Sequence, residues 1–388
     1  MKWEKVKLGE LYEVHNGLSK AGKFFGEGYP FLTFSTVFNN YFIPKQITDL
    51  VQSTEKERES YSIRRGDVFV TRTSETSDEL GMSCVALKDY PMATYNGFTK
   101  RMRPITNRVL PEYIGYYMRL PSFRGEFRAF STMTTRASLR NEDLLGLEVK
   151  LPSIEIQKQI ADILSAYDDL IENNQRQIKL LEEAAQRLYK EWFVDLRFPG
   201  HENTKIVDGV PEGWRISSIY DVFDIKYGKN LPTSKITKAG QYPVYGASGV
   251  IGYYNEKNCD DYATLVTSRG NGSGDVFRTH HKQSYVTNNS FIARRNDKNS
   301  FIENEFTFQL FSNTDFKKLC TGSAQPQLTN TSIQKIKILL PNRQLIEKYQ
   351  RCTIEMSEKQ EALYQEQRAL TQARNRLLPK LMNGTVEV

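Results

Sequence analysis

Arg and Lys side chains recur beside Asn, Gln, Ser and Thr in two parts of the chain, and this mixture suits contact with nucleic acid. Arg reads guanine through two hydrogen bonds or binds phosphate, and Gln pairs with an adenine edge. Each such residue alone is more often a solvated surface charge, so the group counts for more than its members. The candidate DNA-contacting residues are Arg64, Arg65, Arg72, Lys100, Arg101, Arg136 and Arg140, followed by Lys226, Lys229, Arg269, Arg278, Lys282, Gln325 and Gln327.

The residues that a catalytic site needs are missing from the sequence. The glycines in residues 270–274 are not followed by the lysine of a phosphate-binding loop, and G-x-S-x-G and H-E-x-x-H are absent. Neither D-P-P-Y nor N-P-P-Y occurs, the runs with which amino-methyltransferases hold a flipped base. The four histidines and four cysteines are too dispersed for a triad or a metal cage. We therefore predict no catalytic residue, no metal site and no cofactor bound by this chain.

The composition is that of an ordinary soluble protein, with 39% hydrophobic and 26% charged residues. The net charge of +7 and the pI near 9.0 permit DNA binding without establishing it. No apolar run approaches the roughly 18 residues of a membrane span, and no signal peptide precedes the first domain. The separated cysteines are typical of reduced thiols. We expect a cytoplasmic protein that does not contact a membrane.

The chain repeats itself in the same order. Residues 3–17 and 214–228 share a tryptophan, three apolar positions, an acid and a glycine at an offset of 211 (214 − 3). Further matches pair Thr94, Asn96 and Phe98 with Thr287, Asn289 and Phe291 at 193 (287 − 94), and Leu139 and Pro152 with Leu328 and Pro341 at 189 (328 − 139). The offset only falls along the chain, as a collinear duplication with extra loops in the first copy requires. Two similar domains are predicted, with Arg72 and Arg269 at matching places after strands that end in Thr or Ser.

Each copy is followed by a long segment with a helical pattern of apolar residues. The first is expected to span about 38 residues, or roughly 55 Å at 1.5 Å per residue, so a partner helix must cover its apolar stripe. Each helix is the natural partner of the other, in an antiparallel pair. Asn174 either fixes the register of that pair or is simply tolerated. The predicted packing residues are Ile160, Leu164, Tyr167, Ile171, Asn174, Ile178, Leu181 and Leu188 on the first helix, and Tyr349, Met356, Leu363, Leu370 and Leu377 on the second.

These features predict an α+β protein with a pseudo-twofold internal repeat. Two similar mixed α/β domains are separated by two long antiparallel coiled-coil helices. The first domain is expected over residues 1–151 and the first long helix over 152–198. A linker and the second domain follow over 199–340, and the second long helix with a tail over 341–388.

The chain resembles the specificity subunit of type I restriction–modification enzymes, the HsdS family, over essentially its whole length. The run L-Y-K-E-W-F-V-D at residues 188–195 is its most specific motif. It is accompanied, in order, by motifs at residues 198–200, 211–214, 245–253, 268–270 and 377–384. Two departures stand out. The family's Gln after each closing strand is present as Gln157 but replaced by Ile346, and residues 133–136 lack the Gly-Ser-Ala-Gln run that begins at Gly322.

The resemblance implies two target-recognition domains, each reading one half of a bipartite, asymmetric site in double-stranded DNA. It implies that the helices set the spacing and dock two methyltransferase subunits, with two restriction subunits in the full complex. S-adenosylmethionine, ATP and Mg are then expected on those partner subunits, and the chain itself is not an enzyme. Two alternatives remain: a two-headed coiled-coil protein scaffold without DNA binding, and a stand-alone enzyme with diverged motifs. The helices could also serve self-association alone.

Overall fold

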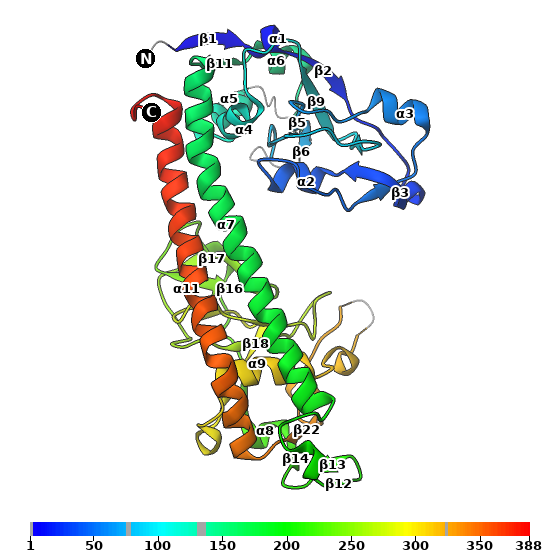
Figure 1. Ribbon diagram of the computed structural model, residues 1–388, viewed down its shortest axis with the longest axis vertical. Helices are drawn as coiled ribbons and strands as arrows, with labels where there is room; N and C mark the ends of the chain where they lie inside the picture. The colour runs from blue at the N-terminus through cyan, green and yellow to red at the C-terminus, as the bar shows by residue number, and fades with distance from the viewer. Residues whose placement is uncertain (1–2, 75–78, 130–136, 323–324) are drawn as a thin grey trace. The chain divides into compact units, whose positions relative to one another are not determined.

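The computed structural model describes residues 3–74, 79–129, 137–322 and 325–388. Its residue contacts divide the chain into two compact units, which we describe separately. Unit 1 holds Met1–Ile171 and Ala369–Val388, and unit 2 holds Glu172–Arg368. Two long helices, α7 (Ile154–Tyr189) and α11 (Arg343–Met382), run without interruption through the boundary between the units (Figure 1). Each unit therefore contains a globular part and one portion of each helix.

The globular part of unit 1 is built from small sheets flanked by short helices. The largest sheet has the order β2-β9-β5-β7 and is antiparallel throughout. A second sheet, β4-β3-β8, pairs β8 with β3 in parallel, and the pairs β1-β11 and β6-β10 are antiparallel. Its strands are β1 (Glu4–Lys7), β2 (Tyr12–Asn16), β3 (Phe25–Leu32), β4 (Leu50–Val51), β5 (Val68–Thr71), β6 (Thr73–Ser74), β7 (Ser83–Val85), β8 (Thr94–Tyr95), β9 (Thr99–Pro104), β10 (Ala137–Ser138) and β11 (Glu148–Leu151). Its helices are α1 (Leu8–Leu11), α2 (Phe34–Asn39), α3 (Glu55–Ser60), α4 (Pro111–Tyr117), α5 (Pro121–Ala129) and α6 (Asn141–Gly146).

Unit 2 repeats this topology. Its largest sheet has the order β15-β21-β18-β19, and β16 pairs with β20 in parallel and with β17 in antiparallel. The pairs β14-β22 and β12-β13 are antiparallel. The strands are β12 (Ile206–Val207), β13 (Val210–Pro211), β14 (Arg215–Ser218), β15 (Phe223–Tyr227), β16 (Tyr242–Tyr245), β17 (Val250–Tyr254), β18 (Thr264–Thr267), β19 (Val276–Arg278), β20 (Tyr285–Val286), β21 (Ser290–Arg295) and β22 (Lys337–Leu340). The short helices are α8 (Ile219–Val222), α9 (Asn304–Ser312) and α10 (Asn330–Ile333).

Equivalent strand pairs confirm the duplication and correct one of its registers. Strands β1 and β2 return as β14 and β15 at the predicted offset of 211. Thr94, however, pairs with β3 at the place where Tyr285 pairs with β16, so its counterpart is Tyr285. The predicted match of Thr94 with Thr287 was wrong by two residues. Side chains on a strand alternate with a period of two, so a two-residue slip leaves the pattern of side chains unchanged.

The start of α7 is tied to its own domain through Gln157, which is fully buried. Its side-chain oxygen accepts a hydrogen bond from the Leu110 backbone at 2.9 Å, and its amide donates to the Arg108 and Pro152 carbonyls at 3.0 Å each. At the place in unit 2 that is equivalent to Gln157, the residue is Ile346, which is fully buried in the core of that unit. A buried, hydrogen-bonded side chain in unit 1 is thus replaced by a buried apolar side chain in unit 2.

The two helices run antiparallel within each unit. In unit 2, the buried Asn174 donates to the Glu366 carboxylate at 3.1 Å, while the Tyr349 hydroxyl donates to the Ala185 carbonyl at 3.2 Å. Residue numbers therefore rise along α7 as they fall along α11. In unit 1, Asp168 of α7 forms an ion pair with Arg374 of α11. The α+β architecture, with two similar mixed domains, two long helices and an internal repeat, is confirmed.

None of the thirteen predicted packing residues of the helices is exposed. Six are buried: Ile160, Leu164, Asn174, Ile178, Tyr349 and Leu363. The others are half-buried: Tyr167, Ile171, Leu181, Leu188, Met356, Leu370 and Leu377. Across the described ranges, no helix is both long enough and apolar enough to cross a membrane.

The far end of each helix lies in the core of the unit that holds the other helix's beginning. In unit 2, Tyr189 and a following π-helical turn (Lys190–Val194) bring Trp192 and Phe193 against Tyr349 of α11 and Phe306 of α9. In unit 1, Leu378 and Leu381 of α11 belong to the same core as Leu164 of α7. Full burial of such side chains contributes about 1.5–3 kcal/mol each.

Two glycines at equivalent places allow a close approach of the backbone in each unit. A Cβ added at Gly17 would collide with the Asn96 carbonyl oxygen, and one added at Gly228 would collide with the Thr287 carbonyl oxygen. We expect Gly17→Ala to lower the free energy of unfolding of the chain by about 1–3 kcal/mol, because backbone must move to admit the methyl group. Urea denaturation of the purified chain measures this difference.

Gly125→Ala is the matched control in the same unit. Gly125 lies in α5 with open space around its Cα, so alanine there should raise the stability by roughly 0.5–1 kcal/mol. Equal effects of the two substitutions would contradict the close-approach argument.

Candidate nucleic-acid interface

A basic hollow lies on the main sheet of unit 2, where β15 ends beside β21. It encloses about 280 Å³ and is lined by Lys226, Lys229, Arg294 and Arg295, with Asp224 as the one acid in its lining. Its remaining lining residues are Tyr227, Gly228, Asn258 and Ile292. Lys226 and Lys229 are exposed. Four cations around one acid form a surface suited to phosphate oxygens.

Three predicted contact residues of unit 2 come together next to this basic hollow. Arg269 is exposed and forms an isolated backbone bridge with Gln327, and Gln325 is exposed two residues earlier. Tyr227, which lines the hollow, donates its hydroxyl to the Leu328 carbonyl at 3.4 Å. We call Arg269, Gln325 and Gln327 the loop trio. Its Arg and Gln side chains are those that read guanine and adenine edges.

Unit 1 carries different chemistry on the equivalent strands. Arg103, the counterpart of Arg294, forms an ion pair at 2.7 Å with Asp67, whose side chain is fully buried. Arg101 is 3% exposed, and its guanidinium donates to the Ser62 carbonyl at 2.8 Å. Lys100 is 5% exposed and donates to Asn141. Burial, followed by the charge of Arg72, lowers the pKa of Lys100.

The other predicted contact residues of unit 1 lie apart. Arg64 is exposed at the turn before β5, and the neighbouring Arg65 forms an ion pair with Glu112 at 2.7 Å. Arg72 is half-buried, and Arg140 is exposed at the start of α6. Arg136 lies outside the described residues, as do the other members of the 133–136 run. At the strand positions of Lys226 and Arg294, unit 1 therefore has His15 and an Arg103 that is paired with a buried carboxylate.

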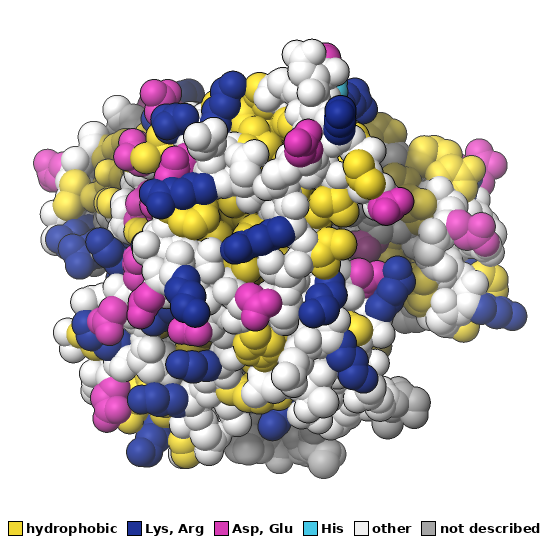
Figure 2. Space-filling view, turned by 90° about the horizontal axis from the view of Figure 1, so that it is seen from below, with side chains coloured by type: hydrophobic (Ala, Val, Ile, Leu, Met, Phe, Trp, Pro, Cys, Tyr) yellow, Lys and Arg dark blue, Asp and Glu magenta, His cyan; other side chains and the backbone are white. Residues whose placement is uncertain are grey.

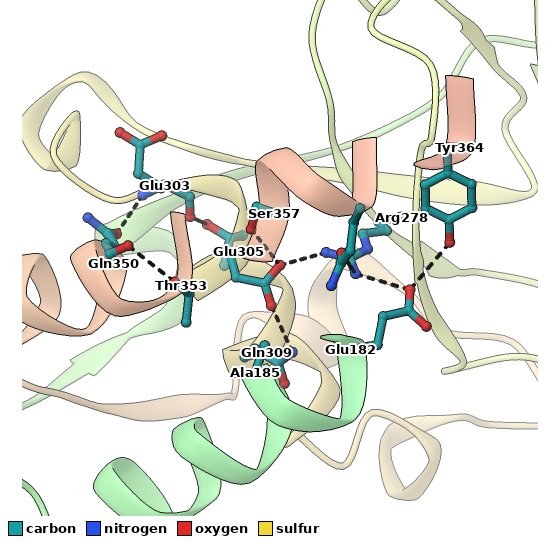
Figure 3. A network of polar contacts seen from close by, with 12 residues as sticks. Glu182, Ala185, Arg278, Glu303, Glu305, Gln309, Gln350, Thr353, Ser357 and Tyr364 are labelled. Atoms are coloured by element: carbon teal, nitrogen blue, oxygen red, sulfur yellow. Dashed lines mark hydrogen bonds and ion pairs between the residues drawn. The ribbon is translucent and has the colours of Figure 1, made fainter. Parts of the chain in front are cut away.

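Arg278 of β19 is committed to contacts inside unit 2. Its guanidinium donates to Glu305 at 2.6 Å and to Glu182 at 3.1 Å (Figure 3). It also donates to Gln360 at 2.8 Å. Its side chain is 16% exposed. Burial lowers the pKa of this guanidinium, but the two carboxylates outweigh burial and raise it overall. Lys282, four residues later, is exposed.

Charge is spread widely over the surface. Figure 2 shows one face on which Lys and Arg side chains alternate with Asp and Glu and with apolar patches. A positive net charge therefore does not mark an interface by itself, and local groups such as the basic hollow carry more information. Within the described ranges, no group of three or more His, Cys, Asp and Glu residues is placed to hold a metal ion.

The sequence matches known proteins along most of its length. The profile of the family described as "Type I restriction modification DNA specificity domain" matches residues 1–183 and 211–364. The chain belongs to the family of type I restriction–modification specificity subunits.

Related specificity subunits and one solved structure agree with this assignment. The MjaIX specificity subunit of Methanocaldococcus jannaschii is 25% identical over 414 residues, which cover 100% of this chain and 94% of that one. The HindI specificity subunit of Haemophilus influenzae is 23% identical over 476 residues, covering 99% of both. The crystal structure of the S subunit of a type I restriction–modification system from M. genitalium shares the fold, with a TM-score of 0.57, 18% identity, and coverage of 98% of this chain and 96% of that one.

The most specific sequence motif of the subunit has a structural basis. Residues 188–195 cover the last residues of α7 and the π-helical turn that follows it, and their Tyr189, Trp192 and Phe193 belong to the aromatic part of the unit 2 core. Phe193 lies 5.3 Å from both Phe306 and Tyr349, measured between ring centroids. Edge-to-face aromatic pairs of this kind favour one arrangement of the rings over others. The motif therefore packs the residues at and just after the end of α7 into the core of unit 2.

Arg72 and Arg269 are not equivalent, and this prediction was wrong. Thr71 pairs with Thr99 where Thr267 pairs with Ser290, so the counterpart of Arg72 is Ser268. Arg269 is one residue further along. Arg269 is exposed, whereas Arg72 is half-buried, and both lie beyond the ends of their strands.

Sequence reasoning missed the long-range polar contacts within each unit. Glu182 and Glu305 contact Arg278 in unit 2, and Asp168 contacts Arg374 in unit 1. Each pair is separated by 27 or more positions in the sequence, and by as many as 206. The heptad pattern shows that such residues flank the apolar stripe, but it contains no information about their partners.

We expect His280, beside this network, to make the stability of the chain depend on pH. Burial, followed by Arg278 and His281, lowers the pKa of His280 from 6.5 to about 4. Between these values the unfolded chain binds more protons than the folded one, so this contribution to stability is complete above pH 6.5 and is lost as the pH falls towards 4. We expect His280→Asn to show a smaller fall in melting temperature between pH 7 and pH 5 than the wild type.

His201→Asn is the control, because His201 lies in a separate turn of the same unit. It should keep the wild-type fall in melting temperature. A His280→Asn variant whose melting temperature falls as steeply as that of the wild type would contradict the assignment.

Proposed function

We propose that this specificity subunit is a non-catalytic DNA reader of a type I restriction–modification complex. Each globular domain recognises one half of a bipartite, asymmetric site in double-stranded DNA. The observation that carries the proposal is that two domains of the same topology present different side chains at equivalent places. Lys226 and Arg294 of the basic hollow have the counterparts His15 and Arg103, and Arg103 is held by the buried Asp67.

The exposed cations and the loop trio of the second domain make different contributions to DNA binding. Lys226 and Lys229 supply salt-dependent attraction to phosphates, which carries no sequence information. Arg269, Gln325 and Gln327 discriminate between bases. Lys100, Arg101 and Arg278 are left out of this interface because their charged groups are bonded within the fold.

The long helices set the distance between the two half-sites, which should lie about one helical turn apart, roughly 34–36 Å. They also dock two methyltransferase subunits, joined in the full complex by two restriction subunits. S-adenosylmethionine, ATP and Mg belong to those partners, and the assembly works in the cytoplasm. The predicted limits, with domains over residues 1–151 and 199–340 and helical segments over 152–198 and 341–388, are part of this proposal.

A two-headed protein scaffold accounts for the helices but leaves the loop trio and the basic hollow without a purpose. Methylome sequencing separates these functions. A host that expresses this chain with its neighbouring methyltransferase subunit should carry methylated adenines at one bipartite, asymmetric motif. Deletion of this chain alone should abolish that methylation. An active methyltransferase partner without any such motif would overturn the proposed function.

Lys226 and Lys229 allow a direct test of the phosphate contacts. With both lysines replaced by Gln, the association constant for duplex DNA should depend less steeply on salt. The magnitude of the slope of log K against log salt concentration should fall by about 2, since each lost phosphate contact removes about 0.9. The motif itself should stay the same. Fluorescence anisotropy of the subunit with its methyltransferase partners, titrated with DNA at several salt concentrations, measures the slope.

The control is the double replacement of Lys335 and Lys337 by Gln. These lysines are exposed in the same unit, at the start of β22, and do not line the basic hollow. They should leave the slope unchanged. An equal loss in both double variants would show that general charge, and not the basic hollow, attracts the DNA.

A further inference from the structure

The charged network around Arg278 joins four elements of unit 2 at one point. Arg278 comes from β19, Glu305 from α9 and Glu182 from α7 (Figure 3). Gln360 comes from α11. The first two belong to the globular domain, and the other two belong to the two long helices. One guanidinium therefore ties the domain to both helices at the same time. We call these four residues the Arg278 junction.

The Arg278 junction is built to hold one geometry. The guanidinium of Arg278 is planar, and its N–H donors point in fixed directions. It can therefore donate to all three acceptors in only one orientation. Glu305 also accepts a hydrogen bond from Gln309 at 2.9 Å and is 7% exposed. Glu182 accepts a further bond from the Tyr364 hydroxyl at 3.4 Å. Arg278 and Glu305 are largely buried, and charges buried to that extent are stable only while their partners stay in place.

Unit 1 has a junction of the same kind made from different residues. Asp168 of α7 forms an ion pair with Arg374 of α11, and the Tyr116 hydroxyl of α4 donates to Asp168 at 2.6 Å. The Arg374 guanidinium lies 5.2 Å from the centroid of the Tyr41 ring. Here too, a group from the domain meets one group from each long helix. Two unlike sets of residues thus serve the same purpose in the two halves of a duplicated chain.

The apolar cores hold domain and helices together but leave small rotations possible, because apolar contact is not directional. Hydrogen bonds between charged groups are directional and remove that freedom. A domain that turns slightly on the helices carries its DNA-contacting loops along or around the duplex.

We propose that Arg278 and Glu182 are positioning residues that determine how many base pairs the subunit accepts between its two half-sites. The proposal rests on the proposed function. The proposal goes beyond that function, because it assigns the preference for one gap length to a polar junction and not to helix length alone. The bases read in each half-site depend on other residues and are unaffected.

Glu182→Gln tests this proposal while sparing the fold. The side chain of Glu182 is 37% exposed, and the variant keeps the bonds from Arg278 to Glu305 and Gln360. DNA substrates with the wild-type gap and with gaps one base pair shorter and longer compete for methylation by the assembled complex. We expect methylation of the altered gaps to rise about tenfold relative to the wild-type gap, the ratio that loss of one charge-assisted hydrogen bond produces.

Glu183→Gln is the matched control. Glu183 is the next residue on α7, its side chain is 40% exposed, and its carboxylate faces Lys179 and Arg187 of the same helix. This variant should keep the strict gap of the wild type. Both variants should keep both half-site sequences, because other residues read the bases. A general loss of structure would be recognised by lower methylation of all substrates together.

The outcomes are distinct. Relaxed gap preference in Glu182→Gln alone supports the proposal. Strict gap preference in both variants, at equal melting temperatures, overturns it while the proposed function stands. Relaxation in both variants also overturns it, because the effect would then follow helix charge and not the Arg278 junction. A wild-type complex without any bipartite motif would overturn the proposed function itself.

Discussion

The structure depends on a reciprocal arrangement of helix ends. Each long helix begins on the domain that precedes it and ends inside the core of the unit that contains the other domain. Trp192 and Phe193, in the turn that follows α7, pack in unit 2, and Leu378 and Leu381 near the end of α11 pack in unit 1. The core of each unit therefore contains residues of both long helices, which run antiparallel there.

Two kinds of interaction divide the work at these contacts. The apolar cores supply most of the free energy, since hydrophobic burial is the dominant favourable contribution to folding. The polar junctions at Arg278 and Asp168 add little net stability, because burying charges costs nearly as much as their pairing returns. Their contribution is a defined orientation. A protein that must hold reading loops at fixed places on a duplex needs both.

The parts of the fold that repeat at regular intervals could be predicted from the sequence. The heptad stripe of both helices and the duplication of β1 and β2 as β14 and β15 follow from spacing alone. Registers within the domains were less secure, because a two-residue slip at Thr94 satisfies the same alternation. Which cations face solvent could not be predicted. Arg278 and Lys229 are alike in sequence terms, and only the fold brings Glu182, 96 positions from Arg278, into contact with it.

The division into units also orders the events of synthesis. Unit 2 is one continuous stretch, residues 172–368, whereas unit 1 consists of two stretches separated by all of unit 2. The ribosome makes those 197 residues (368 − 172 + 1) at about 5–20 residues per second. During that time, Ile160 and Leu164 lack the leucines of α11 that belong to the same core. The second domain can close as it emerges. The first domain is translated first and completed last.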